Sequence, residues 1–163
     1  MRLAALFSAL SIIGAGAALG APPPSVIAAG GRSAYAIVLP DRPTPVERAA
    51  ARELQRCLRI STGATLPITT EGRASARRKR LLVGACAVSR RLAPAHVLRN
   101  LGADGIVLWT VGDDLVIAGG KPRGVYYAVC EFLHRYVGCR WWDEKNETIP
   151  QRTTLPLPKA ALR

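Results

Sequence analysis

The sequence predicts an α+β domain in which a mixed β-sheet carries two long helices packed on one face. The main observations are several short apolar runs suited to buried strands, and two longer stretches with apolar residues at helical spacing. Along the chain the expected order is strand, helix, strand, strand, loop, hairpin, helix and short strand. This order is typical of helices packed against a single sheet. With 163 residues, the chain can hold one such domain and an appendage.

Residues 1–21 are expected to be a signal peptide that lies outside the fold. Arg2 provides a positive start, residues 3–19 are apolar and small, and Ala18-Leu19-Gly20 provides small residues before a cleavage point. The alternative is a transmembrane anchor, because the apolar run approaches a spanning length. Three prolines follow without a basic stop signal, which favours cleavage. The protein is therefore expected to be secreted or periplasmic.

The rest of the chain divides into a Pro- and Gly-rich spacer over residues 22–32, an α/β domain over residues 33–157 and a basic tail over residues 158–163. The domain is expected to open with a buried strand from Tyr35 to Leu39, since this short apolar run ends at Pro40-Asp41.

The clearest local signal is a helix that begins after Thr44. Thr44 suits the N-cap, Pro45 the first helical position and Glu47 the third, so that the Thr hydroxyl and the Glu carboxylate can cap each other's backbone amides. Gly63 is suited to end the helix in the left-handed conformation. Apolar residues recur at helical spacing, and four arginines are expected to face outward: Val46, Ala50, Leu54, Cys57 and Leu58, with Arg48, Arg52, Arg56 and Arg59.

The middle of the chain is expected to contain two short strands and a basic loop. The strands are Leu66 to Thr70 and Leu81 to Gly84, and the polar stretch 71–80 between them has no periodicity. The stretch from Ser89 to Leu101 is only weakly helical because Pro94 interrupts it.

A β-hairpin and a second long helix are expected next. Gly105 to Val111 and Leu115 to Ala118 are apolar runs joined by Gly112-Asp113-Asp114, which is typical of a tight turn. Gly119-Gly120-Lys121-Pro122 then turns the chain into the helix, and Gly138 ends it. Beyond this helix the chain is expected to be short and extended, then irregular.

The formal net charge is +12, and most of the 23 basic residues are arginine. Arginine suits the recognition of phosphate or carboxylate, although a solvated basic surface gives the same composition. Nucleic acid is not an expected partner of an exported protein, so acidic polysaccharide is the better candidate. Cysteines 57, 86, 130 and 139 match no zinc spacing, and buried thiols are expected in preference to a disulfide framework.

No set of side chains predicts a complete active site, a metal site or a cofactor site. A glycosidase needs two carboxyl groups that face each other across the scissile bond. Asp113 and Asp114 belong to a turn, and the acidic residues near the C-terminus are clustered in one stretch. The two histidines are isolated, and Gly119-Gly120-Lys121 lacks the spacing of a phosphate-binding loop.

Two sets of residues are candidates for substrate binding. Arg77, Arg78 and Arg80 in the basic stretch can contact uronates, with a solvated loop as the alternative. Trp141 and Trp142 can stack on sugar rings, or they can cover the end of the sheet or an interdomain surface.

Two stretches carry a resemblance to a known family. The stretch LVIAGGKPRGVYYAVCEFLHRYVGCRWW, residues 115–142, resembles the last hairpin strand and helix of the N-terminal domain of bacterial α-glucuronidases. A similar arrangement occurs in the non-catalytic second domain of β-N-acetylhexosaminidases. The earlier stretch YAIVLPDRPTPVERAAARELQRCLRISTGATLPI resembles the opening strand and helix of the same domain. The resemblance covers residues 33–157 and rests on the double Gly, the aromatic-rich helix and the terminal Gly-x-Arg-Trp.

This resemblance implies an accessory domain of glycoside hydrolases, whose usual partner is a (β/α)8 barrel that holds the catalytic acids. The chain is too short for this domain plus a barrel, which needs about 250 residues. No catalytic residue is therefore carried over. The expected function is a non-catalytic accessory domain that packs on a barrel in the same or another chain. The alternative is a stand-alone binding module for acidic polysaccharide.

Overall fold

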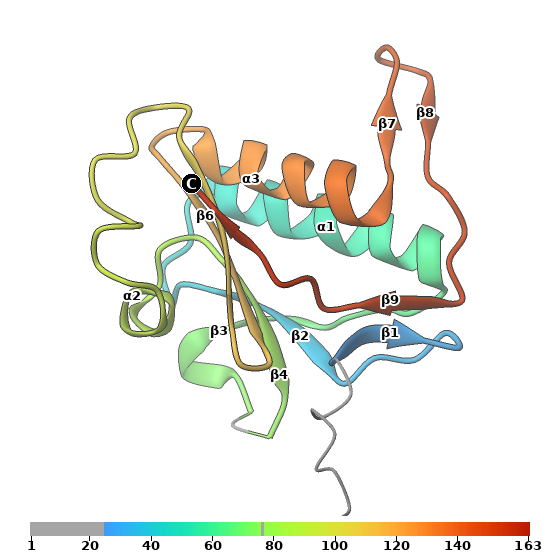
Figure 1. Ribbon diagram of the computed structural model, residues 1–163, viewed down its shortest axis with the longest axis horizontal. Helices are drawn as coiled ribbons and strands as arrows, with labels where there is room; N and C mark the ends of the chain where they lie inside the picture. Colours follow the sequence, from blue (N-terminus) through green and yellow to red (C-terminus); the bar gives the residue numbers. More distant parts are fainter. Residues whose placement is uncertain (1–24, 76) are drawn as a thin grey trace, which may run out of the picture.

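The computed structural model describes residues 25–75 and 77–163 (Figure 1). The expected signal peptide over residues 1–21 lies outside these described residues. Among the helices that the structure describes, none combines the length and the apolar character needed to cross a membrane.

The described residues form helices and mostly short strands. The helices are α1 (Pro45–Thr62), α2 (Ala87–Leu92) and α3 (Gly124–Phe132), with a 3-10 turn η1 (Glu71–Arg73) and a π-helical turn η2 (Leu133–Val137) that continues α3. The strands are β1 (Val26–Ala29), β2 (Tyr35–Leu39), β3 (Ile68–Thr70), β4 (Lys79–Val83), β5 (Ile106–Val111), β6 (Asp114–Gly119), β7 (Arg140–Trp141), β8 (Glu147–Thr148), β9 (Thr154–Pro156) and β10 (Ala161–Leu162).

A mixed six-stranded sheet in the order β10-β5-β6-β4-β2-β3 forms the centre of the domain. Strands β3, β2, β4 and β6 are parallel, whereas β5 pairs antiparallel with β6 and β10 pairs antiparallel with β5. Two small antiparallel pairs, β1-β9 and β7-β8, lie outside this sheet. The prediction of an α+β fold with a mixed sheet is confirmed.

The two faces of the sheet are covered by different elements. Helices α1 and α3 lie side by side on one face (Figure 1), where the odd-numbered residues of β2 join the main core cluster. Side chains alternate between faces along a strand, so Ala36 and Val38 point to the opposite face. There they pack in a smaller cluster with residues from α2 and the segment that follows it, including Ala93 and Val97. Burial on both faces explains why β2 consists entirely of apolar residues.

Helix α1 begins and ends as its sequence predicts. The hydroxyl of Thr44 accepts from the Glu47 amide at 3.2 Å, and the Glu47 carboxylate accepts from the Thr44 amide at 2.7 Å. Gly63 caps the C-terminus with φ of 74°. The predicted β5-β6 hairpin and the helix from Gly124 that ends at Gly138 are also confirmed.

Several segments are more ordered than the sequence suggests. The expected spacer contains β1, which pairs with β9, and the expected basic tail contains β10, which pairs with β5. The weakly helical stretch begins with the short helix α2. These elements are two to six residues long, so they carry too little periodicity to be recognised.

Candidate functional site: the tryptophan hairpin

The most exposed aromatic residue of the described chain, Trp142, lies on the β7-β8 hairpin, next to a second exposed tryptophan. We call residues 140–148 the tryptophan hairpin. It projects from the body of the domain beyond the end of α3 (Figure 1), and every residue in it is exposed. Trp141 is 38% exposed and Trp142 is 70% exposed. Two-stranded hairpins are marginally stable in water unless they pack on something, so this one depends on the contacts at its base.

Hydrogen bonds within the hairpin fix its shape. The Asp143 carboxylate accepts from the backbone amides of Lys145 and Asn146, both at 2.8 Å, and so holds the turn. The indole Nε1 of Trp142 donates to the Thr148 hydroxyl at 3.0 Å. The one polar atom of the Trp142 ring is thereby bonded within the hairpin, and the rest of its exposed surface is apolar.

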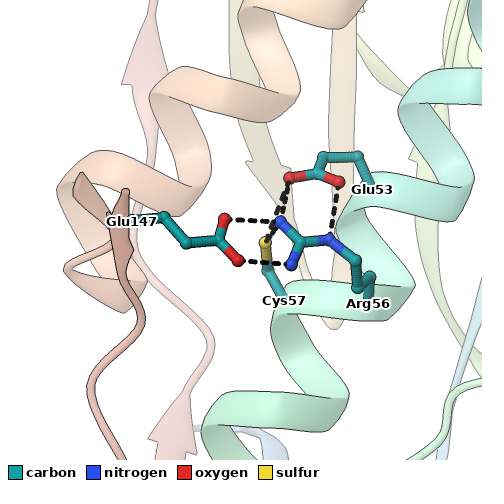
Figure 2. Close-up of polar contacts among 4 residues, drawn as sticks. All are labelled: Glu53, Arg56, Cys57 and Glu147. Carbon is teal, nitrogen blue, oxygen red and sulfur yellow. Dashed lines mark hydrogen bonds and ion pairs between the residues drawn. The ribbon is translucent and has the colours of Figure 1, made fainter. Parts of the chain in front are cut away.

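Arg56 of α1 anchors the hairpin to the domain (Figure 2). Its guanidinium makes two bonds to Glu147 on β8, from Nη1 at 2.6 Å and from Nη2 at 2.7 Å. It makes two more to Glu53 on its own helix, from Nε at 2.9 Å and from Nη2 at 2.8 Å. Two bidentate pairs on one guanidinium fix its orientation, and they join residues that are 91 positions apart. Arg56 was expected on the outward face of the helix, and its side chain is 36% exposed there while it pairs with the hairpin.

Both carboxylates in this network are paired with the same guanidinium, and they do not form an acid–base pair. Hydrogen bonds from Arg56 hold the pKa values of Glu53 and Glu147 below their ordinary range. The Cys57 thiol donates to Glu53 at 3.3 Å, and its pKa is raised, chiefly by its hydrogen bond with Cys139 and by burial. The guanidinium occupies the space between the two carboxylates, so a sugar cannot enter there. The network is structural.

Acid is expected to weaken the anchor. A carboxylate whose pKa is lowered by folding stabilises the protein above its unfolded pKa, near 4.5 for Glu, and this stabilisation is lost as the pH falls through the folded value. Between pH 6 and pH 3, wild type should lose about 1 kcal/mol more than Glu147→Gln in the free energy of unfolding. Urea titrations of both proteins at each pH measure the difference. Equal losses would show that the Glu147 pair contributes nothing.

The basic residues that the sequence singled out do not meet the tryptophans. Arg77 and Arg78 are exposed in the turn before β4, at the opposite end of the domain from the tryptophan hairpin (Figure 1). Arg80 was expected in the same loop, but it belongs to β4. Its Nε donates to Asp114 on the neighbouring strand β6 at 3.1 Å, and its backbone amide donates to the same oxygen at 3.0 Å. Its guanidinium group therefore takes part in an ion pair between neighbouring strands.

The remaining reactive groups form no site among the described residues. Cys57, Cys86 and Cys139 are buried free thiols, and Cys130 is a half-buried one whose pKa burial raises to about 11. No group of three or more histidine, cysteine or acidic side chains in the described chain is arranged to hold a metal ion.

Comparison with known proteins places this arrangement in a family. The model of the glycosyl hydrolase family 67 N-terminus matches residues 31–132, which run from the turn after β1 through α3. The tryptophan hairpin follows this matched region. No curated protein matches the chain. This N-terminal domain is an accessory domain of α-glucuronidase and usually accompanies a family 67 catalytic domain. The match covers more than half of the sequence, and the chain therefore belongs to the family of glycosyl hydrolase family 67 N-terminal domains.

Proposed function

We propose that this chain is an exported, non-catalytic accessory domain that docks on a family 67 catalytic domain through its tryptophan hairpin. The observation that carries the proposal is the hairpin itself. It projects from the domain, exposes two tryptophans and is held in one orientation by the Arg56–Glu147 pair. Tryptophan is enriched at the centres of protein interfaces because its large ring loses little conformational entropy on binding.

The family indicates which protein would bind to the tryptophan hairpin. A family 67 N-terminal domain usually accompanies a family 67 catalytic domain. Without such a partner, the rings of Trp141 and Trp142 remain exposed to water. Covering them would remove apolar surface from solvent, and the Trp142 Nε1 would not be left unpaired because it already bonds to Thr148. The domain would then hold the catalytic domain in position.

The test is the affinity of the purified chain for a family 67 catalytic domain encoded in the same genome, measured by isothermal titration calorimetry. Replacing both Trp141 and Trp142 with serine should weaken binding more than about tenfold, the loss expected when interface hot spots are removed. Tyr127→Ser is the matched control, because Tyr127 is an aromatic residue that is 42% exposed on α3. No binding by wild type, or an equal loss in the control, would refute the proposed docking surface.

The export part of the proposal rests on the N-terminal sequence. Residues 1–21 combine a positive start, an apolar core and small residues before a run of prolines, and this pattern favours cleavage during export. Intact-mass analysis of the protein recovered from its native host should show a chain that begins near residue 22. A full-length chain that remains in the cytoplasm would contradict it.

A second candidate function is the binding of acidic polysaccharide. It is supported by the net charge of +12 and by the exposed side chains of Arg77 and Arg78. Such binding would weaken steeply as salt is added, since exposed charges are screened within about 10 Å at 0.1 M salt. Binding to uronate polymers that does not respond to salt would argue against it.

A further inference from the structure

A pocket at the edge of the central sheet gathers positive charge away from the tryptophan hairpin. It has a volume of about 350 Å³ and lies between β3, the first half of α1 and η1. Its apolar residues are Leu39, Pro43 and Ile68, and Thr69 and Thr70 of β3 also line it. Three arginines complete the lining: Arg48, Arg52 and Arg73.

These three arginines bring like charges to the lining of one pocket. Arg48 and Arg52 are four residues apart on α1, so they share one helix face, where like charges repel. Arg73 approaches from η1 on the other side of the pocket. The pocket lining contains no carboxylate.

The acidic residues near this pocket in the sequence are bonded elsewhere. Asp41 accepts from the Gly72 amide at 2.8 Å, and Glu71 accepts from the Ala87 amide at 2.9 Å. Glu47 belongs to the α1 cap, and Glu53 pairs with Arg56. None of the ion pairs within the described residues includes Arg48, Arg52 or Arg73. The pocket is therefore positively charged without an internal counterion.

We propose that this pocket binds the oxyanion of a small acidic saccharide. The guanidinium groups would hold the carboxylate or sulfate through charged hydrogen bonds, and the hydroxyl of Thr70, on the same face of β3 as Ile68, would bond to a sugar hydroxyl. The apolar floor around Leu39 and Ile68 would contact the carbon face of the ring. The volume lies within the range of small-molecule sites, roughly 300–1,000 Å³. This site is independent of docking through the tryptophan hairpin.

The test is an NMR titration of the full chain with four probes: a hexuronate, a hexose 6-sulfate, a neutral hexose and inorganic sulfate. We expect saturable shifts at the amides of Thr69 and Thr70 with one or both acidic sugars, and weaker binding as salt is added. A response to the hexuronate alone identifies the ligand as a carboxylate, and a response to the sulfated sugar alone identifies it as a sulfate ester. A response to both shows that the pocket accepts either oxyanion.

Substitutions locate the site. Arg52→Gln should weaken binding of the acidic sugar by at least about tenfold, since hydrogen bonds to charged groups are among the strong ones. Arg59→Gln is the matched control, because Arg59 is exposed on the same helix and does not line the pocket. The proposal is overturned by an equal loss in the control, by equally tight binding of the neutral hexose or of sulfate alone, by shifts that centre elsewhere, or by no saturable binding.

Discussion

We expect Gly120→Ala to destabilise the domain by more than about 3 kcal/mol, because a side chain at this position meets backbone that cannot move aside. A Cβ on Gly120 would lie 1.4 Å from the Gly102 carbonyl oxygen. The Gly120 amide also donates to the Gly105 carbonyl at 2.8 Å, which ties this turn to the start of β5. Urea unfolding monitored by circular dichroism measures the loss in the free energy of unfolding.

Gly112→Ala is the control for this substitution. Gly112 lies in the β5-β6 turn with φ of +57°, and a Cβ there has nothing within 4 Å. This substitution should lower the free energy of unfolding by about 1 kcal/mol, because it adds only the strain of a left-handed backbone. Similar losses for the two variants would contradict the close packing at Gly120. Gly119-Gly120 therefore has a structural explanation. The Gly120 amide is already bonded and is not free to bind a phosphate group.

The second large effect is expected at Arg56. Arg56→Met removes the four hydrogen bonds to Glu53 and Glu147 and leaves these carboxylates near each other without their guanidinium partner. The free energy of unfolding at neutral pH should fall by about 2 kcal/mol, between the values typical of exposed and buried ion pairs. Thermal or urea unfolding measures this change.

The control is Arg59→Met, on the same helix. Arg59 is exposed and takes part in no ion pair within the described residues, so its replacement should change stability little. In Arg56→Met alone, the amides of the tryptophan hairpin should exchange hydrogen faster, since the anchor at the base of β8 is lost. A cost no larger than that of the control would show that Arg56 does not stabilise the fold.

Much of the fold can be predicted because its main elements carry local signals. The cap formed by Thr44 and Glu47 defines the start of α1, and the Gly112-Asp113 turn defines the β5-β6 hairpin. The strands β1 and β10 carry no such signal, since their register is set by pairing with chain segments more than 50 residues away. Their existence depends on tertiary contacts that the local sequence does not encode.

The candidate site shows the same limit of prediction from local sequence. The tryptophans were recognised from composition, but their anchor was not, because Glu147 lies 91 residues from Arg56. Only the Glu53–Arg56 pair, three residues apart on one helix, has a spacing that sequence reasoning can use. Arg80 was placed in a loop because β4 begins with two basic residues, and its partner Asp114 was assigned to a turn. Pairing between neighbouring strands gives both residues their structural role.

The proposed docking surface is tested most directly by hydrogen–deuterium exchange of the chain with and without a family 67 catalytic domain. We predict slower exchange at the amides of residues 140–148 in the complex, with no change in α2 on the opposite face of the sheet. Protection confined to α2, with the tryptophan hairpin exchanging as it does in the free chain, would contradict the account.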